Sequence, residues 1–337
     1  MFPFEIKNVE EQLNKQLMDD FKGERNGFCQ VGPKKWFLPV QYKDHADKYY
    51  NFKLREDDLW IVTYPRSGTT FTQELLWLVN NDCDFEKAKN TVLIERFPFF
   101  EFNVLHSKQF TDEIIELNGR KEEVIKELER RHIPGYVFGE EMASPRHLKT
   151  HLPLSLLPPK LLDTCKVVYV ARNAKDVAIS YFHHNRLFTA HDFSGDFDKY
   201  WDYFEKDLLL YSPYLDHIKE GWSQKDHPNL LFLFYEDLIY DLEGCIRKIA
   251  AFLNKSISDE QIEKLKKHLH IDNFRNVPIM KNVKIDGLVN SGAEGFIRRG
   301  KVGGNKEYAT NADLDSRADK WVENNLPKTG VKFPMRN

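Results

Sequence analysis

The sequence has 337 residues, of which 41% are hydrophobic and 13% aromatic, enough for one large α/β domain or two ordinary ones. Its 49 lysines and arginines nearly balance 52 aspartates and glutamates, so the net charge does not favour nucleic acid or an anionic membrane as a partner. The four scattered cysteines argue against a disulfide framework or zinc finger, and no signal peptide or membrane-spanning run is visible, so we expect a cytoplasmic protein.

Short apolar runs alternate with helical patterns along most of the chain. The apolar runs at 58–64, 165–171 and 230–234 are typical of buried strands, and residues 147–152 look like the end of another strand. Helical patterns follow at 70–80, after Asn173, and near 241–253, 258–270 and 311–326. This alternation predicts an α/β fold, with a parallel β-sheet flanked by helices on both faces. We expect residues 1–45 to form an extension that packs on the core, and residues 46–337 to form a single domain.

Two segments without a strand pattern are candidates for covering a binding site. Residues 96–105 concentrate aromatic side chains around Pro98, and they are expected to shape a pocket. Residues 111–131 are charged and helical, which favours a solvated surface helix over a lid.

The first strand is followed by a short loop that predicts a phosphate cradle. Gly68 would let the backbone approach an anion, and the next helix would offer free N–H groups. Hydroxyl and guanidinium donors surround it, from Arg66, Ser67, Thr69 and Thr70. The Walker A pattern is missing, and a simple capped turn is the alternative.

Lys149 and His151 lie two residues apart near the end of the second strand, so their side chains would face the same side. A histidine can take a proton from a hydroxyl, and a lysine can stabilise negative charge on a transferring group. The alternative is a packed histidine with no catalytic role.

Arg172 follows the third strand, and Ser180 lies two turns along the next helix, where both could hold a second phosphate. A salt bridge at the start of the helix is the alternative for Arg172. Residues 296–300 form a short basic loop that ends in a glycine. His183 and His184 lack the context of metal ligands, and we predict no metal site.

Taken together, five segments resemble the cytosolic sulfotransferases, with some similarity to insect members. They read TYPRSGTT (63–70), KTHLPL (149–154), VVYVARNAKDVAIS (167–180), LFYED (233–237) and FIRRG (296–300), in the order of the family. The resemblance implies a single nucleotide-binding α/β domain with a P-loop-like strand–loop–helix. It also implies sulfuryl transfer from 3′-phosphoadenosine 5′-phosphosulfate (PAPS) to a hydroxyl of a small lipophilic acceptor, with adenosine 3′,5′-bisphosphate (PAP) as product.

The resemblance also implies roles for individual residues. His151 would be the general base, with Lys149 and Arg66 stabilising the sulfuryl group in flight. The nucleotide would be held by Arg66, Ser67, Gly68, Thr69, Thr70, Phe71, Arg172, Ser180, Tyr211, Arg298, Arg299 and Gly300. Among these, Tyr211 would contact adenine, and Arg172, Ser180 and residues 298–300 would hold the 3′-phosphate.

This sequence departs from the family pattern at four places. Arg66 replaces the usual lysine, as in an insect retinol dehydratase, and the two cations differ in geometry. Phe71 replaces a tryptophan that stacks on adenine, and Leu269 replaces a threonine. Residues 306–315 match the dimer motif only loosely, so the resemblance allows a homodimer without requiring one.

Three other functions remain open at this level. Arg66 suggests a dehydratase that eliminates water from an allylic alcohol, such as retinol, through a transient sulfate ester. A kinase-like enzyme would need the Walker lysine, which is missing. A non-catalytic carrier of apolar ligands would need no base at His151.

Overall fold

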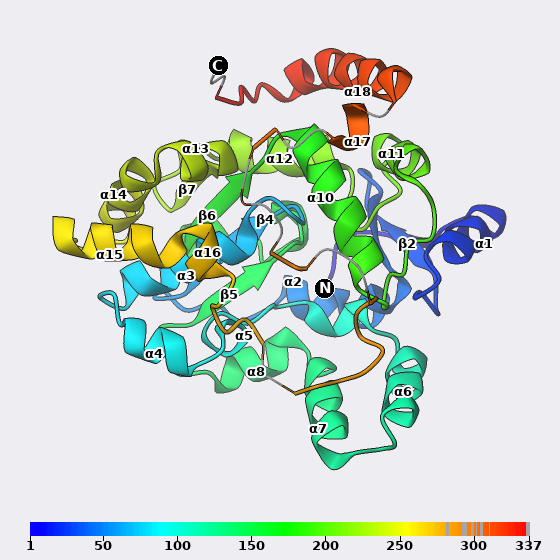
Figure 1. Ribbon diagram of the computed structural model, residues 1–337, viewed down its shortest axis with the longest axis horizontal. Coiled ribbons are helices and arrows are strands. Elements are labelled where there is room, and N and C mark those ends of the chain that lie inside the picture. The colour runs from blue at the N-terminus through cyan, green and yellow to red at the C-terminus, as the bar shows by residue number, and fades with distance from the viewer. Residues whose placement is uncertain are drawn as a thin grey trace.

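The computed structural model describes residues 1–280, 283–291, 295–297, 300, 302–303, 306–309 and 311–334. Its central element is a four-stranded sheet in the order β5 (His147–Thr150), β4 (Leu59–Thr63), β6 (Lys166–Ala171) and β7 (Leu230–Phe234). All three strand pairs are parallel, and all four strands lie in segments that the sequence predicts as strands (Figure 1). The predicted α/β class with a parallel sheet is therefore confirmed.

The two faces of the sheet belong to two separate apolar cores, because successive side chains of a strand point to opposite sides. Trp60 and Val62 of β4 pack in a core that includes α10 (Ala174–Leu187). Leu59 and Ile61 pack in the other core, together with α3 (Thr69–Asn80) and the pair α14 (Leu242–Phe252) and α15 (Asp259–Leu269). Both faces are thus covered by helices, as the continuous apolar runs predict.

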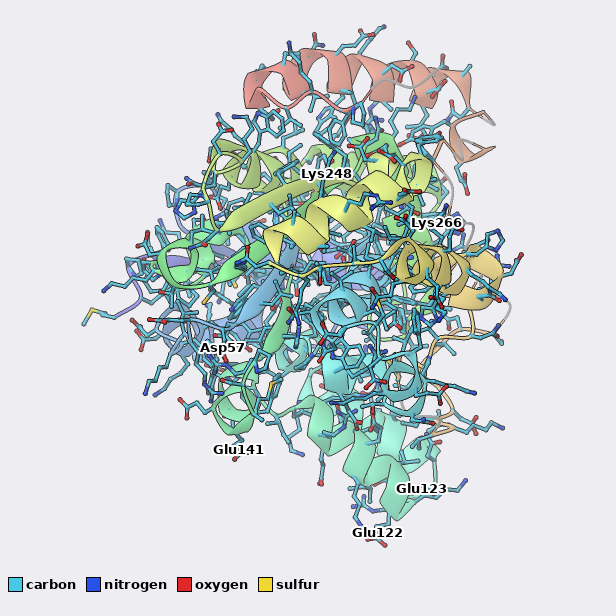
Figure 2. All side chains as sticks on the ribbon, turned by 90° about the vertical axis from the view of Figure 1, so that its left-hand side faces the viewer. Asp57, Glu122, Glu123, Glu141, Lys248 and Lys266 are labelled. Carbon is cyan, nitrogen blue, oxygen red and sulfur yellow. The ribbon has the colours of Figure 1, made fainter. Side chains whose placement is uncertain are left out.

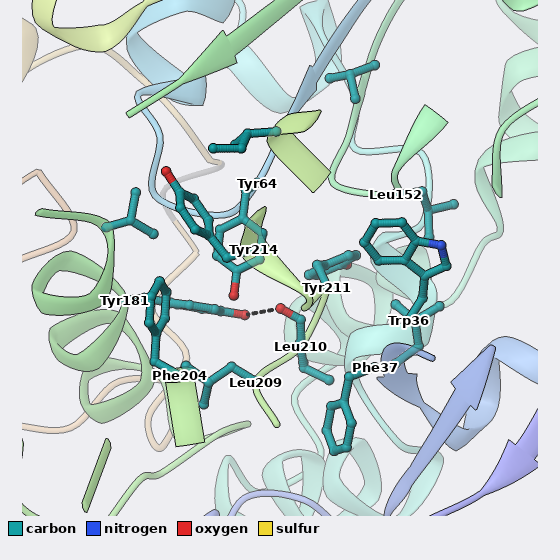
Figure 3. Packing of buried hydrophobic residues seen from close by; sticks show 14 of the residues in the cluster. Trp36, Phe37, Tyr64, Leu152, Tyr181, Phe204, Leu209, Leu210, Tyr211 and Tyr214 are labelled. Carbon is teal, nitrogen blue, oxygen red and sulfur yellow. Dashed lines mark hydrogen bonds between the residues drawn. The ribbon is translucent and has the colours of Figure 1, made fainter. Parts of the chain in front are cut away.

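The N-terminal segment forms a second, antiparallel sheet that the sequence patterns did not predict. Its strands are β1 (Ile6–Asn8), β2 (Phe28–Val31) and β3 (Trp36–Pro39), in that order. Their apolar side chains, among them Trp36 and Phe37, join the core that holds Tyr211 (Figure 3). At the edge of this sheet, Phe37 exchanges backbone hydrogen bonds of 2.8 and 2.7 Å with Ser212 and Tyr211. The N-terminal sheet therefore anchors the loop that carries Tyr211.

The charged segment 111–131 is not one helix but part of a hairpin of α6 (Lys108–Leu117) and α7 (Glu122–Arg131). The chain turns at Gly119 and Arg120, both in the left-handed region, with φ of 64° and 53°. The hairpin has its own small apolar cluster, which includes Phe110, Val124 and Ile285. At its outer end, the exposed Glu122 and Glu123 project away from the body of the molecule (Figure 2).

The remaining elements connect and flank these parts. They are α1 (Glu11–Asp20), η1 (Val40–Asp44), α2 (Ala46–Tyr50), α4 (Phe85–Asn90), α5 (Leu93–Arg96), η2 (Phe102–Leu105), α8 (Gly135–Glu141), η3 (Leu154–Leu156), α9 (Leu161–Thr164), α11 (Phe197–Glu205), α12 (Tyr214–Ser223), α13 (Tyr235–Tyr240), α16 (Ile271–Phe274), α17 (Lys306–Ala309), α18 (Ala312–Asn325) and η4 (Leu326–Thr329). Among the described residues, no helix combines the length and the apolar character needed to cross a membrane.

Candidate active site

The loops that follow β4, β5 and β6 meet at one edge of the sheet, around a cavity of about 810 Å³. In parallel sheets, ligands bind beyond the carboxyl ends of the strands, where these loops converge. The walls contain eleven of the residues singled out from the sequence: Arg66, Gly68, Thr69, Thr70, Phe71, Lys149, His151, Arg172, Ser180, Tyr211 and Gly300. The structure therefore brings together segments that are far apart in the sequence.

The loop after β4 has the backbone geometry of an anion cradle. Gly68 caps α3 with a φ of 95°, and a Cβ atom at this position would lie 2.4 Å from the ring of Tyr235. Only glycine fits here, because the conformation is left-handed and the ring leaves no room for a side chain. The hydroxyl of Ser67 is buried beside this turn and has no hydrogen-bond partner among the described residues. Such an unpaired donor at a helix N-terminus suits a phosphate oxygen.

Arg66 links the cradle to the other loops of the cavity. Its Nε donates to the hydroxyl of Ser180 at 3.1 Å, and a terminal nitrogen donates to the carbonyl of Phe296 at 3.0 Å. Arg172 in turn donates to the backbone carbonyl of Arg66 at 3.1 Å, and its guanidinium lies 4.4 Å from the ring of Tyr235. Two guanidinium groups and the Ser180 hydroxyl thus gather beside the cradle, in a protein whose overall charge is near zero.

His151 is held in a defined tautomer. Its Nδ1 lies 2.8 Å from the carbonyl oxygen of Thr63, and a carbonyl oxygen can only accept, so Nδ1 carries the proton. The other ring nitrogen, Nε2, is then left with a lone pair. Burial, with the charge of Lys149 as the next cause, holds the pKa of His151 well below its usual 6.5. The imidazole is therefore neutral at physiological pH and able to accept a proton at Nε2.

Lys149 stands beside His151 in a partly apolar environment. Its ammonium lies 3.7 Å from the centroid of the Phe99 ring, the geometry of a cation–π contact. Burial lowers the pKa of Lys149 to about 8, while the carboxylate of Glu101 opposes that shift. The lysine is thus mostly charged at neutral pH and close to losing its proton.

Glu101 is a residue of this site that the sequence analysis missed. Its carboxylate is fully buried and accepts hydrogen bonds of 2.7 Å from the Thr150 hydroxyl and from the His151 backbone N–H. Burial raises the pKa of Glu101 to about 7. No local signal separates it from the other glutamates, because its place depends on segment 98–100 pairing with Lys149 at the sheet edge.

Tyr211 and Tyr235 occupy different ends of the cavity. Tyr211 was expected to contact adenine, yet its ring centre lies 5.4 Å from that of His151, beside the proton-accepting group. Its backbone is in the left-handed region, with a φ of 70°. Tyr235, which was not singled out, lies beside Gly68 and Arg172 instead. The sequence did contain a signal for Tyr235, because this residue lies in the LFYED segment (233–237) that resembles the family.

Some predicted site residues cannot be placed. Arg298 and Arg299 lie outside the described residues, whereas Gly300 borders the cavity with a φ of 59°. Within the described ranges, no three histidine, cysteine, aspartate or glutamate side chains are grouped in a way that could hold a metal ion.

Comparisons with known proteins agree with this geometry. A family model described as "Sulfotransferase domain" matches residues 56–330. Bovine sulfotransferase 1E1 is 33% identical over 300 residues, which cover 87% of this chain and 92% of the relative.

Two solved structures of retinol dehydratase also match, each over 99% of both chains. One, in complex with androsterone and inactive cofactor PAP, has a TM-score of 0.91 and 36% identity. The other, in a complex with retinol and PAP, has a TM-score of 0.87 and 34% identity. With the family model covering most of its length, this chain belongs to the sulfotransferase family of enzymes, whose co-substrate is PAPS.

Proposed function

We propose that this protein transfers a sulfuryl group from PAPS to a hydroxyl of a small lipophilic acceptor. The observation that carries the proposal is the convergence of an anion cradle and a neutral, oriented histidine in one largely apolar cavity. An anion site alone would fit many nucleotide enzymes. The histidine adds a proton acceptor beside the place where the transferable group would sit.

The nucleotide would be held by two groups of residues. Backbone N–H groups from Gly68 onward, with the side chains of Arg66 to Thr70, would bind the 5′ end, and Phe71 would stack on the base. Arg172, Ser180 and residues 298–300 would bind the 3′-phosphate. Tyr235 fits the nucleotide side because it lies between Gly68 and Arg172, whereas Tyr211 fits the acceptor side because it faces His151.

The acceptor oxygen would attack the sulfur of PAPS in line, so that a new S–O bond forms as the bond between sulfur and the phosphate oxygen breaks and PAP leaves. Nε2 of His151 takes the proton from the acceptor hydroxyl, while the Thr63 carbonyl holds the ring in the required tautomer. The ammonium of Lys149 stabilises negative charge that develops across the transferring group. The carboxylate of Glu101 accepts a hydrogen bond from the backbone N–H of His151 and so holds that backbone in place.

The cavity walls indicate the class of acceptor. Beyond His151 they are made mostly of aromatic and aliphatic side chains, including Phe99, Phe102, Leu105, Phe188 and Leu288. Such walls favour an apolar body next to the reacting hydroxyl, as in a phenol, a sterol or another lipophilic alcohol.

The test is incubation of the protein with PAPS and a panel of phenols, sterols and long-chain alcohols, with product detection by mass spectrometry. We expect a sulfate ester from at least one acceptor. His151→Ala should abolish this product while PAP binding, measured by calorimetry, persists. If no acceptor is sulfated, the proposal fails. If ligand binding and physiological function survive in His151→Ala, a non-catalytic carrier is the better interpretation.

A second candidate is a dehydratase that forms a sulfate ester of an allylic alcohol and then eliminates it. Two observations favour it: Arg66 in the phosphate loop, and the match to retinol dehydratase over 99% of both chains. Incubation with retinol and PAPS separates the two candidates, because elimination gives a product with one double bond more. A stable sulfate with no such product would exclude the dehydratase.

A further inference from the structure

The cavity has a second polar end that neither donor binding nor proton transfer uses. Most of its wall beyond His151 is apolar, but Arg131 at the end of α7, His106 after η2, and His191 also line it. None of the five segments that resemble the family includes these three residues.

A row of aromatic rings connects the reacting end of the cavity to this second end. The ring of Phe99 lies 5.0 Å from His151 and 5.6 Å from Phe102, and Phe102 lies 5.0 Å from His106, all measured between ring centres. Phe99, Phe102 and His106 all line the cavity. A flat, apolar molecule placed along this row would present its two ends to two different imidazoles.

A second series of rings, from Tyr181 to His191, also lines the cavity. His184 lies beside Tyr181, with 5.8 Å between ring centres, and 5.6 Å from His191. Burial lowers the pKa of His191 to about 4, so its ring is neutral. Arg131 and His106 line the same cavity, and the charge of Arg131 is one cause of the lowered pKa of His106.

Arg131 has hydrogen-bonding capacity left over. In the described part of the chain, its one carboxylate partner is Glu127, at 3.4 Å, and Glu127 also binds Arg130 at 3.1 Å. Two guanidinium groups therefore share one carboxylate, which leaves a positive charge at the cavity wall. The side chain of Arg131 is only 11% exposed, so most of it is shielded from bulk water.

His106 adds a second unsatisfied group. Its Nδ1 is buried and makes no hydrogen bond to any described residue. Burial, followed by the charge of Arg131, lowers the pKa of His106 to about 3, and a backbone contact with Phe102 opposes that shift. The ring is therefore neutral, with one N–H and one acceptor nitrogen. A buried polar atom without a partner is uncommon unless a ligand or water completes it.

We propose that the acceptor carries a carbonyl oxygen, of a ketone or a carboxylate, at the end opposite its reacting hydroxyl, and that Arg131 and His106 bind this oxygen. The inference rests on the proposed function and narrows its substrate class. A guanidinium only donates hydrogen bonds and is positively charged, so an oxygen acceptor fits and an ammonium group does not. The aromatic row between the two ends requires an apolar body.

The test compares two steroids that differ only at the far end. Androsterone has a 3α-hydroxyl and a 17-ketone, and 5α-androstan-3α-ol lacks the ketone. Equilibrium binding of each steroid to the protein saturated with PAP is measured alongside kcat/KM for sulfation. We expect the ketone to bind roughly 10- to 100-fold more tightly, the range for a hydrogen bond to a charged group. Arg131→Met should remove that preference and leave binding of the deoxy steroid unchanged.

Lys126→Met is the matched control, because it removes a positive charge from the same helix at an exposed position that pairs with Glu122 and does not line the cavity. It should keep the preference for the ketone. His106→Phe gives a second, independent reduction of that preference if Arg131→Met folds poorly. Equal binding of both steroids by the unaltered protein, or equal losses for both in Arg131→Met, would overturn the inference. A binding preference without any sulfated product would support this site while the proposed function fails.

Discussion

Nδ1 of His151 lies 2.8 Å from the carbonyl oxygen of Thr63, the last residue of the neighbouring strand. The parallel pairing of β4 and β5 brings these two atoms together, although 88 residues separate them in the sequence. The contact determines which ring nitrogen can accept a proton. It therefore makes the orientation of the base a consequence of the sheet.

The tautomer of His151 can be measured directly. We expect nuclear magnetic resonance of the ring to show a proton on Nδ1, with no titration near pH 6.5, because burial keeps the pKa well below that value. His217 is the internal control, because its Nε2 donates to the His151 carbonyl at 2.9 Å and its pKa is lowered to about 4. A proton on Nε2 of His151 would contradict the proposed role of Thr63.

The alkaline limb of the pH profile should come from Lys149. Its pKa is lowered to about 8, so its charge is lost as the pH rises through that value, and kcat/KM for PAPS should fall with it. Lys149→Arg keeps the charge at every accessible pH and should move the limb to higher pH, at a lower maximal rate. An unchanged limb in Lys149→Arg would assign it to another group.

The charge of Glu101 should also affect the alkaline limb of the pH profile, because it raises the pKa of Lys149. Glu101→Gln keeps the shape of the side chain but removes the negative charge that supports the charged form of Lys149. We expect the limb to move to lower pH, with a larger loss of kcat/KM at pH 8 than at about pH 6.5. Glu141→Gln, at an exposed position, should leave the profile unchanged (Figure 2). A loss that is the same at every pH would indicate a structural role only.

The cradle can be tested with a pair of glycines. Gly68→Ala adds a methyl group 2.4 Å from the ring of Tyr235, and we expect calorimetry to show at least a tenfold loss of PAP affinity. Gly119→Ala is the control, because Gly119 has a similar left-handed φ but no atom within 4 Å of the added Cβ. It should cost about 1–2 kcal/mol of stability and leave PAP affinity intact. Normal affinity in Gly68→Ala would place the nucleotide elsewhere.

A buried ion pair near the start of β4 should be important for stability. Arg146 and Asp58 are almost fully buried and share hydrogen bonds of 2.7 and 2.5 Å. Asp58→Asn leaves the guanidinium charge uncompensated, so we expect a loss of about 3–5 kcal/mol in the free energy of unfolding. The exposed neighbour Asp57 provides the control, and urea denaturation of Asp57→Asn should show a change below about 0.5 kcal/mol. Equal effects at both positions would contradict this account.

Much of the fold could be predicted from local patterns. The four strands of the central sheet and the helix after the cradle were predicted because apolar runs and helical periodicity are properties of short segments. Asn173 was expected to cap a helix, and its side chain accepts from the Lys175 N–H at the start of α10. The N-terminal sheet was missed because its short strands depend on contacts distant in the chain, such as the backbone hydrogen bonds of Phe37 with Tyr211 and Ser212.

The sequence by itself determined which residues end the strands and therefore which ones reach the cavity. Only the tertiary structure decided their partners: Glu101 under His151, Tyr211 on one side of the cavity and Tyr235 on the other, and Arg66 on Ser180, 114 residues away. The physical reason is that strand and helix patterns depend on neighbouring residues. Which side chains meet depends on strand register and on the packing of segments that are distant in the chain.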